Sequence, residues 1–230
     1  MNSSLPNTYN SISCIPVAVD CIIFGFHDNQ LELLLIHRGF EPEKGKWSLM
    51  GGFVQEEEDL DVAASRVLQQ LTGLDDIYME QVNTFGKVTR DPGGRVISVA
   101  YYALIRKATY NKRLVEHNNA QWFSLYDLPE MIFDHLEMVE KAIEKLRQKV
   151  KTEPIGFNLL PPKFTLPQLQ ALYEAILNEP IDKRNFRKKI QSLNILEKLD
   201  EKDKAHSKKG AYLFRFQEEA FEENSTFNLY

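Results

Sequence analysis

The chain has 230 residues, enough for one large domain or two modest ones, and its 43% hydrophobic and 27% charged residues are ordinary for a globular protein. Its two cysteines exclude a disulfide framework and a cysteine-based zinc site, and they favour a reducing, cytoplasmic location. The longest apolar run, residues 12–26, contains a proline and an aspartate, is shorter than the roughly 20 residues that span a membrane, and follows no basic segment, so neither a membrane anchor nor a signal peptide is expected.

The net charge of −5 is unevenly distributed along the chain. Residues 1–150 carry 15 Lys and Arg against 21 Asp and Glu, whereas residues 182–215 carry 11 basic residues against 5 acidic ones. A basic block inside an acidic protein indicates a local polyanionic partner. A solvated, lysine-rich surface is the alternative that charge alone leaves open.

Residues 12–150 contain more strand than helix. A β-hairpin is predicted first, because two β-rich runs flank the turn residues His27-Asp28-Asn29-Gln30. A helix follows a strand interrupted by Gly51-Gly52, and it ends at Gly73, a residue suited to a left-handed C-cap. The expected strands are 14–26, 31–37, 47–54, 78–87, 95–105 and 120–123, and the expected helices are 60–71 and 127–151.

The sequence changes in character beyond residue 152, where prolines 154, 161 and 162 mark a connection. Thr165 and Asp182 can cap two successive helices, and two strands then flank a lysine-rich tip, which is the layout of a winged helix. We predict an α+β fold (a mixed α/β sandwich) for residues 1–152, followed by a C-terminal winged helix-turn-helix domain over residues 153–230. The elements expected in the second domain are helices 166–177 and 182–192 and strands 196–199 and 212–216.

Residues 52–74 resemble the Nudix box, whose pattern is G-x5-E-x7-R-E-U-x-E-E-x-G-U with U aliphatic. The resemblance implies a Nudix-like fold for the first domain, and it extends to residues 39–51, to the Arg90-Asp91-Pro92 loop and to residues 120–123. Six box positions match at the required spacing: Gly52, Glu58, Arg66, Leu68, Gly73 and Leu74. We expect Glu58 and Arg66 to form a structural ion pair.

The three family positions that bind metal hold Val67, Gln70 and Leu71. At i, i+3 and i+4 these positions share one helix face, which carries carboxylates in active members because Mg²⁺ prefers hard oxygen ligands. Valine and leucine cannot ligate Mg²⁺. We therefore expect a catalytically inactive Nudix-like domain with no metal and no cofactor. A Nudix hydrolase of nucleoside diphosphate derivatives with an unusual metal site is the enzymatic alternative.

An inactive Nudix-like domain is expected to keep its ligand cleft. The candidate ligand-binding residues, taken from the positions of the family's cleft, are His37, Arg38, Trp47, Ser48, Lys87, Arg90 and Asp91. Each has a structural alternative: Trp47 suits a core as well as a ligand platform, and Arg90 with Asp91 suits a closed loop.

The helix expected over residues 182–192 carries the apolar Phe186 and Ile190 on one side. The opposite side presents Arg, Lys and Gln, and these suit the DNA major groove, where Arg reads guanine and Gln reads adenine. The candidate DNA-binding residues are Lys183, Arg184, Asn185, Arg187, Lys188 and Gln191 on the helix and Lys204, Lys208 and Lys209 on the wing. A basic amphipathic surface helix is the structural alternative.

A Nudix-like domain followed by residues such as 164–177 and 182–187 is similar to the Nudix-related transcriptional regulators of bacteria, over nearly the whole chain. The resemblance implies a homodimeric repressor that binds a double-stranded DNA operator and a small-molecule effector. The NrtR branch controls NAD metabolism and responds to ADP-ribose, whereas the AraR type controls pentose use and responds to L-arabinose. We expect the AraR type, because a neutral sugar needs no Mg²⁺ to offset a diphosphate. A non-enzymatic, protein-binding adaptor is a third hypothesis.

Overall fold

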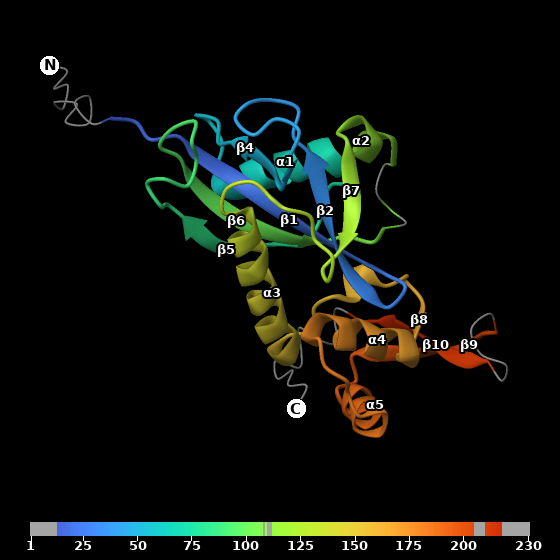
Figure 1. Ribbon diagram of the computed structural model, residues 1–230. Helices are drawn as coiled ribbons and strands as arrows, with labels where there is room; N and C mark the ends of the chain where they lie inside the picture. Colours follow the sequence, from blue (N-terminus) through green and yellow to red (C-terminus); the bar gives the residue numbers. More distant parts are fainter. Residues whose placement is uncertain (1–12, 108, 110–111, 205–209, 218–230) are drawn as a thin grey trace, which may run out of the picture.

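The computed structural model describes residues 13–107, 109, 112–204 and 210–217, which form two domains (Figure 1). None of the helices in these ranges is both long and apolar enough to cross a membrane. The elements of the first domain are β1 (Val17–His27), β2 (Gln30–His37), β3 (Trp47–Ser48), β4 (Met50–Phe53), α1 (Leu60–Thr72), β5 (Met79–Phe85), β6 (Ile97–Leu104), α2 (Lys112–His117), β7 (Ala120–Ser124) and α3 (His135–Thr152). Those of the second are η1 (Phe157–Leu159), β8 (Phe164–Thr165), α4 (Leu166–Leu177), α5 (Lys183–Ser192), β9 (Leu196–Asp203) and β10 (Ala211–Phe216).

A seven-stranded mixed sheet forms the first domain, with β1 at its centre. β1 pairs in parallel with β6, and it pairs antiparallel with β4 near its start and with β2 near its end. β3 and β7 both extend the sheet from β2, and β5 extends it from β6.

Side chains of β1 alternate between two cores, because successive residues of a strand point to opposite faces of the sheet. Val19 and Ile23 pack with residues of α1 on one face, and Ile22 and Phe24 pack with residues of α3 on the other. The helix α1 ends at Gly73, whose φ of 70° is the left-handed cap that the sequence predicts. The mixed α/β sandwich is therefore confirmed.

The second domain is a winged helix, as predicted. Its three strands lie in the order β8-β10-β9 beside α4 and α5. Thr165 forms a capping box with Gln168 at the start of α4, and Asp182 accepts a hydrogen bond from the Asn185 N–H (2.7 Å) at the start of α5. Phe186 and Ile190 are the buried residues of α5.

The two domains share one hydrophobic core, which runs from the sheet through α3 into the winged helix. Polar contacts reinforce this packing: Arg147 Nε on α3 donates to the Ile176 carbonyl (2.9 Å), and the Tyr126 hydroxyl lies 2.6 Å from Asn178 Oδ1. The Nudix-like domain and the winged helix are therefore packed against each other. The boundary between residues 152 and 153 stays a prediction, since α3 contacts both domains.

Several elements differ from the expectation. α3 begins at His135, because a turn that includes Phe133 (φ 51°) precedes it. The expected strand 47–54 is divided into β3 and β4 at Leu49, whose N–H donates to His135 Nδ1 (3.0 Å) instead of a neighbouring strand. The sequence does not predict α2, η1 or β8, which are short and lack a clear periodic pattern.

Candidate functional site

A cavity of ≈ 360 Å³ opens in the Nudix-like domain between β1, β2, β4 and the loops that follow β2, β5 and α2. We call it the effector cavity. Five of the seven candidate ligand-binding residues line it: His37, Arg38, Ser48, Arg90 and Asp91. Residues that are far apart in the sequence therefore meet around one space that is large enough for a small-molecule ligand.

A buried ionic cluster forms the floor of this cavity. Arg90 makes a bidentate pair with Asp134, with Nη2–Oδ1 at 2.8 Å and Nε–Oδ2 at 3.0 Å, and the Arg90 side chain is only 3% exposed. Asp20 Oδ2 lies 3.7 Å from the same guanidinium and accepts a hydrogen bond from Ser98 Oγ (2.5 Å). The Arg90 charge is thus compensated within the protein, so Arg90 holds the floor in shape before any ligand arrives.

His135 completes the floor as a neutral side chain. Its Nδ1 accepts the Leu49 N–H, and its Nε2 lies 3.9 Å from Asp20 Oδ1. An imidazole nitrogen that accepts a hydrogen bond carries no proton, so the proton sits on Nε2. Burial lowers the pKa of His135 below its usual value and outweighs the attraction of the Asp20 charge.

The rim of the cavity combines a cation with aromatic rings. Arg38 Cζ lies 3.9 Å from the centroid of the Phe40 ring and 5.6 Å from that of Phe133. Arg38 Nε donates to the Pro42 carbonyl (2.6 Å), which fixes the side chain at the mouth. Phe40 is 61% exposed. A guanidinium beside the exposed Phe40 ring can receive a phosphate together with a planar ring.

The structure does not place Trp47 or Lys87 among the lining residues of the cavity. Trp47 packs edge-on against Phe123 (4.8 Å between ring centroids) and His37 (5.2 Å), beside the core of the α3 face. Lys87 is exposed and pairs with Glu137 (2.7 Å). These contacts agree with the core alternative for Trp47 and assign Lys87 to an ion pair on the surface.

The Nudix-box helix does not present a metal-binding face. Val67 and Leu71 are fully buried in the core on the α1 side, whereas Gln70 is exposed. The three side chains therefore do not form the common metal-binding face that these positions form in active members. Glu58 is held by Arg66, with Nη2–Oε1 at 2.5 Å and Nε–Oε2 at 2.9 Å, which is the predicted ion pair. Within the described ranges no three His, Cys, Asp or Glu side chains gather as a metal would require. The donor set therefore does not fit Mg²⁺.

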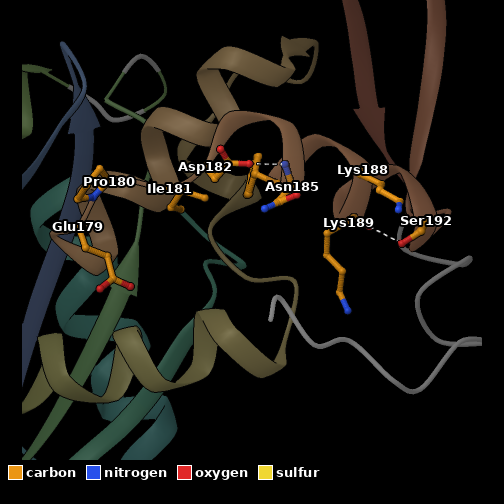
Figure 2. A pocket seen from close by; sticks show the side chains of 9 residues that line it. Glu179, Pro180, Ile181, Asp182, Asn185, Lys188, Lys189 and Ser192 are labelled. Atoms are coloured by element: carbon orange, nitrogen blue, oxygen red, sulfur yellow. Dashed lines mark hydrogen bonds between the residues drawn. The ribbon is translucent and has the colours of Figure 1, made fainter.

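The helix α5 exposes a basic face opposite its buried residues. Arg184 and Lys188 lie across the helix from Phe186 and are exposed. On one flank of α5 a cavity of ≈ 640 Å³ is lined by Asn185, Lys188 and Lys189 together with the α4–α5 connection. Figure 2 shows Asn185 beside Asp182 at the capped start of the helix, and Lys188 and Lys189 nearer its end, by Ser192.

The other flank of α5 faces the wing. Arg187 and Gln191 line a groove with Lys198 and Tyr212. Lys198 Nζ lies 3.8 Å from the centroid of the exposed Tyr212 ring, and Lys202 Nζ lies 4.5 Å from it. These two wing lysines are additional candidates for DNA contact. Lys204 is exposed at the end of the described part of the wing, whereas Lys208 and Lys209 fall outside the described residues.

Family comparisons match each domain. The description "NUDIX domain" matches residues 15–142, and "NrtR DNA-binding winged helix domain" matches residues 156–216. An ADPR responsive transcriptional repressor, NtrR, of Acinetobacter baylyi is 36% identical over 204 residues, which cover 87% of this chain and 81% of that protein. The chain belongs to the NrtR family of Nudix-fused winged-helix transcriptional regulators.

Solved structures of NrtR agree over the whole fold. Shewanella oneidensis NrtR in complex with a 27mer DNA superposes with a TM-score of 0.83 at 31% identity, covering 93% of this chain and 99% of that one. The NUDIX domain of the same protein in complex with ADP ribose gives a TM-score of 0.50 at 33% identity over 58% of this chain and 90% of that one.

An ADP-ribose pyrophosphatase of Methanocaldococcus jannaschii is 32% identical over 54% of this chain and 70% of its own length.

Sequence reasoning does not single out Asp20, Asp134 or His135. They are separated from their partners by more than 40 residues, and only the assembled sheet and the start of α3 bring them together. The one available signal is an aspartate inside the apolar run of β1, since a charge in a buried strand needs a partner.

Proposed function

We propose that this NrtR family member is a transcriptional repressor that binds operator DNA through α5 and the wing and releases it when ADP-ribose occupies the effector cavity. The observation that carries the proposal is the match over 93% of the chain to an NrtR structure that holds DNA. The exposed basic face of α5 and the lysines of the wing supply the surface that such binding needs. A homodimer would present two such helices to a palindromic operator in the cytoplasm.

The comparisons favour ADP-ribose over L-arabinose as the effector. The Acinetobacter relative is described as ADPR-responsive and the Shewanella NUDIX domain was solved with ADP ribose, while none of these descriptions names L-arabinose. The rim of the cavity agrees with this choice. Phe40 and Phe133 offer faces for the adenine ring, and Arg38 offers a guanidinium for a phosphate. The expectation of an AraR-type sugar sensor is therefore replaced by its alternative.

Binding without hydrolysis follows from the Nudix-box helix. Active members use carboxylates where this chain has Val67 and Leu71, both of which are buried. The similarity to an ADP-ribose pyrophosphatase favours hydrolysis as the second candidate function. Turnover of ADP-ribose that needs Mg²⁺ and disappears in Glu58→Gln would select that candidate.

The test is calorimetric titration of the full chain with ADP-ribose and with L-arabinose. ADP-ribose should bind, and Arg38→Ala should weaken that binding at least about tenfold because the rim cation is lost. Lys87→Ala is the matched control, since it removes a cation that lies outside the cavity, and it should bind like the wild type. Binding of L-arabinose but not of ADP-ribose would contradict the proposed effector.

A further inference from the structure

A second large cavity, of ≈ 810 Å³, lies between the two domains and shares no lining residue with the effector cavity. The Nudix-like domain contributes the β1–β2 turn, Arg106 and Lys107, and the winged helix contributes the starts of α4 and α5. Figure 1 shows the β1–β2 end of the sheet directed at the winged helix. We call this space the interdomain cleft.

The interdomain cleft carries an excess of positive charge. Arg106, Lys107, Lys183 and Arg187 face it, against the carboxylates of Asp28 and Asp203. Lys107 forms an ion pair with Glu32, which does not line the cleft. With that pair set aside, Arg106, Lys183 and Arg187 face the carboxylates of Asp28 and Asp203, which leaves an excess of one positive charge, and none of the three cations makes an ion pair within the described part of the chain.

Two of these side chains hold buried donors that have no acceptor. Arg106 Nε and Arg187 Nε are both shielded from solvent, and neither donates to any atom of the described residues. Because these Nε atoms are shielded from solvent, an acceptor from outside the chain can reach only the terminal nitrogens of the two guanidinium groups that line the cleft. A guanidinium is planar and forked, and a phosphate group is the acceptor that matches it in charge and in shape.

The position of α5 identifies the source of that phosphate. Lys183 and Arg187 are four residues apart and so lie on one flank of the helix that we assign to the operator, beside the outermost face formed by Arg184 and Lys188. Pro167 and Gln168, in the first turn of α4, line the same cleft. In helix-turn-helix proteins the helix before the recognition helix crosses the DNA backbone. A phosphate beside the occupied major groove thus falls at the mouth of the cleft.

We propose that the interdomain cleft receives a backbone phosphate of the operator and that Arg106 of the Nudix-like domain binds it together with Lys183 and Arg187. This inference rests on the proposed function, because it adds a contact to the same DNA complex. The DNA-binding surface then spans both domains, and the Nudix-like domain itself contacts the DNA.

The test compares Arg106→Gln with Lys141→Gln in the full chain, by fluorescence anisotropy on the operator at several salt concentrations. Lys141 is an exposed residue of α3 that pairs with Glu144 and lines neither cavity, so its loss removes the same charge from the same domain. Arg106→Gln should weaken binding about tenfold and reduce the salt dependence by about one phosphate equivalent, while Lys141→Gln should behave like the wild type. ADP-ribose affinity should be unchanged in both variants, which shows that they are folded.

Equal operator affinity of Arg106→Gln and Lys141→Gln would overturn the inference and leave the proposed function intact. Weaker binding with an unchanged salt dependence would also overturn it, since Arg106 would then act without a phosphate. If Arg106→Gln binds the operator normally but loses affinity for free pyrophosphate, the cleft binds a small anion and not the DNA backbone, which also overturns the inference. Absence of operator binding by the wild type would overturn the proposed function itself.

Discussion

At the scale of single residues, the buried charges beside the effector cavity compensate one another within the protein. Arg90 is enclosed by Asp134 and Asp20, and the network satisfies buried charges that would otherwise be costly. Arg90 is therefore held by the protein itself, whereas the terminal nitrogens of Arg38 make no hydrogen bond within the described residues.

Breaking this buried pair should cost much more stability than breaking a surface pair. Asp134→Asn leaves the Arg90 charge without its bidentate partner, and breaking a buried pair costs about 3–5 kcal/mol in the free energy of unfolding. Because Asp20 stays 3.7 Å from the guanidinium, we expect a loss at the lower end of this range. Glu137→Gln removes the exposed pair with Lys87 in the same region and should cost far less, because solvent screens this pair. Urea denaturation of both variants checks the difference, and equal losses would contradict the structural role of Arg90.

At the scale of elements, a polar group ties the edge of the sheet to α3. Glu80 on β5 accepts hydrogen bonds from Tyr78 and Tyr102 and pairs with Lys145 and Lys149 of α3, at 3.0 and 2.9 Å. Burial opposes the ionisation of Glu80, but these hydrogen bonds outweigh it and lower its pKa to about 2. Because α3 also packs on the winged helix, this link helps to fix the position of the second domain.

The depressed pKa of Glu80 predicts a dependence of stability on pH. A carboxyl group whose pKa is lower in the folded state contributes its full stabilisation above the unfolded pKa, near 4.5, and loses it as the pH falls toward 2. Glu80→Gln should therefore flatten the loss of stability between about pH 5 and pH 2. Glu140→Gln, an exposed carboxylate on α3, the helix whose Lys145 and Lys149 pair with Glu80, is the control. Thermal unfolding of the wild type and both variants across this pH range measures the dependence of stability on pH. Identical acid profiles for the wild type and Glu80→Gln would contradict the stabilising role of the ionised Glu80.

The elements also show which features the sequence could predict. The caps at Gly73, Thr165 and Asp182 are local signals, and the structure has all three. The winged helix and the Nudix-box helix follow from periodicity and motif spacing. The start of α3 depends on the turn at Phe133, and the division of the strand at Leu49 depends on a contact with His135, 86 residues away, which no local pattern encodes.

Part of the candidate site could be predicted from the sequence, and the rest depends on tertiary packing. Family positions give the rim residues His37 and Arg38, because strand ends are fixed by the fold that the motif implies. The partners Asp20 and Asp134 are set by tertiary packing, and so is the interdomain cleft. Arg106 in particular follows β6 in an ordinary-looking segment, and only the docking of the two domains gives it a role.

At the scale of the whole molecule, the central strands connect the two cavities. β1 places Asp20 in the effector cavity and His27 in the interdomain cleft, and β2 starts beside the cleft and ends at His37 in the effector cavity. ADP-ribose can release DNA only if it binds better to the arrangement that does not bind DNA. A two-state change in how these strands meet the winged helix would provide that difference.

The most direct measurement is fluorescence-anisotropy titration of the full chain onto its own upstream intergenic DNA, at fixed salt, alone and with ADP-ribose or L-arabinose. We expect tight binding that ADP-ribose relieves and L-arabinose does not, and a large loss of binding in Arg184→Ala while its affinity for ADP-ribose is retained. Tight binding relieved only by L-arabinose, or no salt-dependent binding to this DNA, would contradict the assignment as an ADP-ribose-controlled repressor.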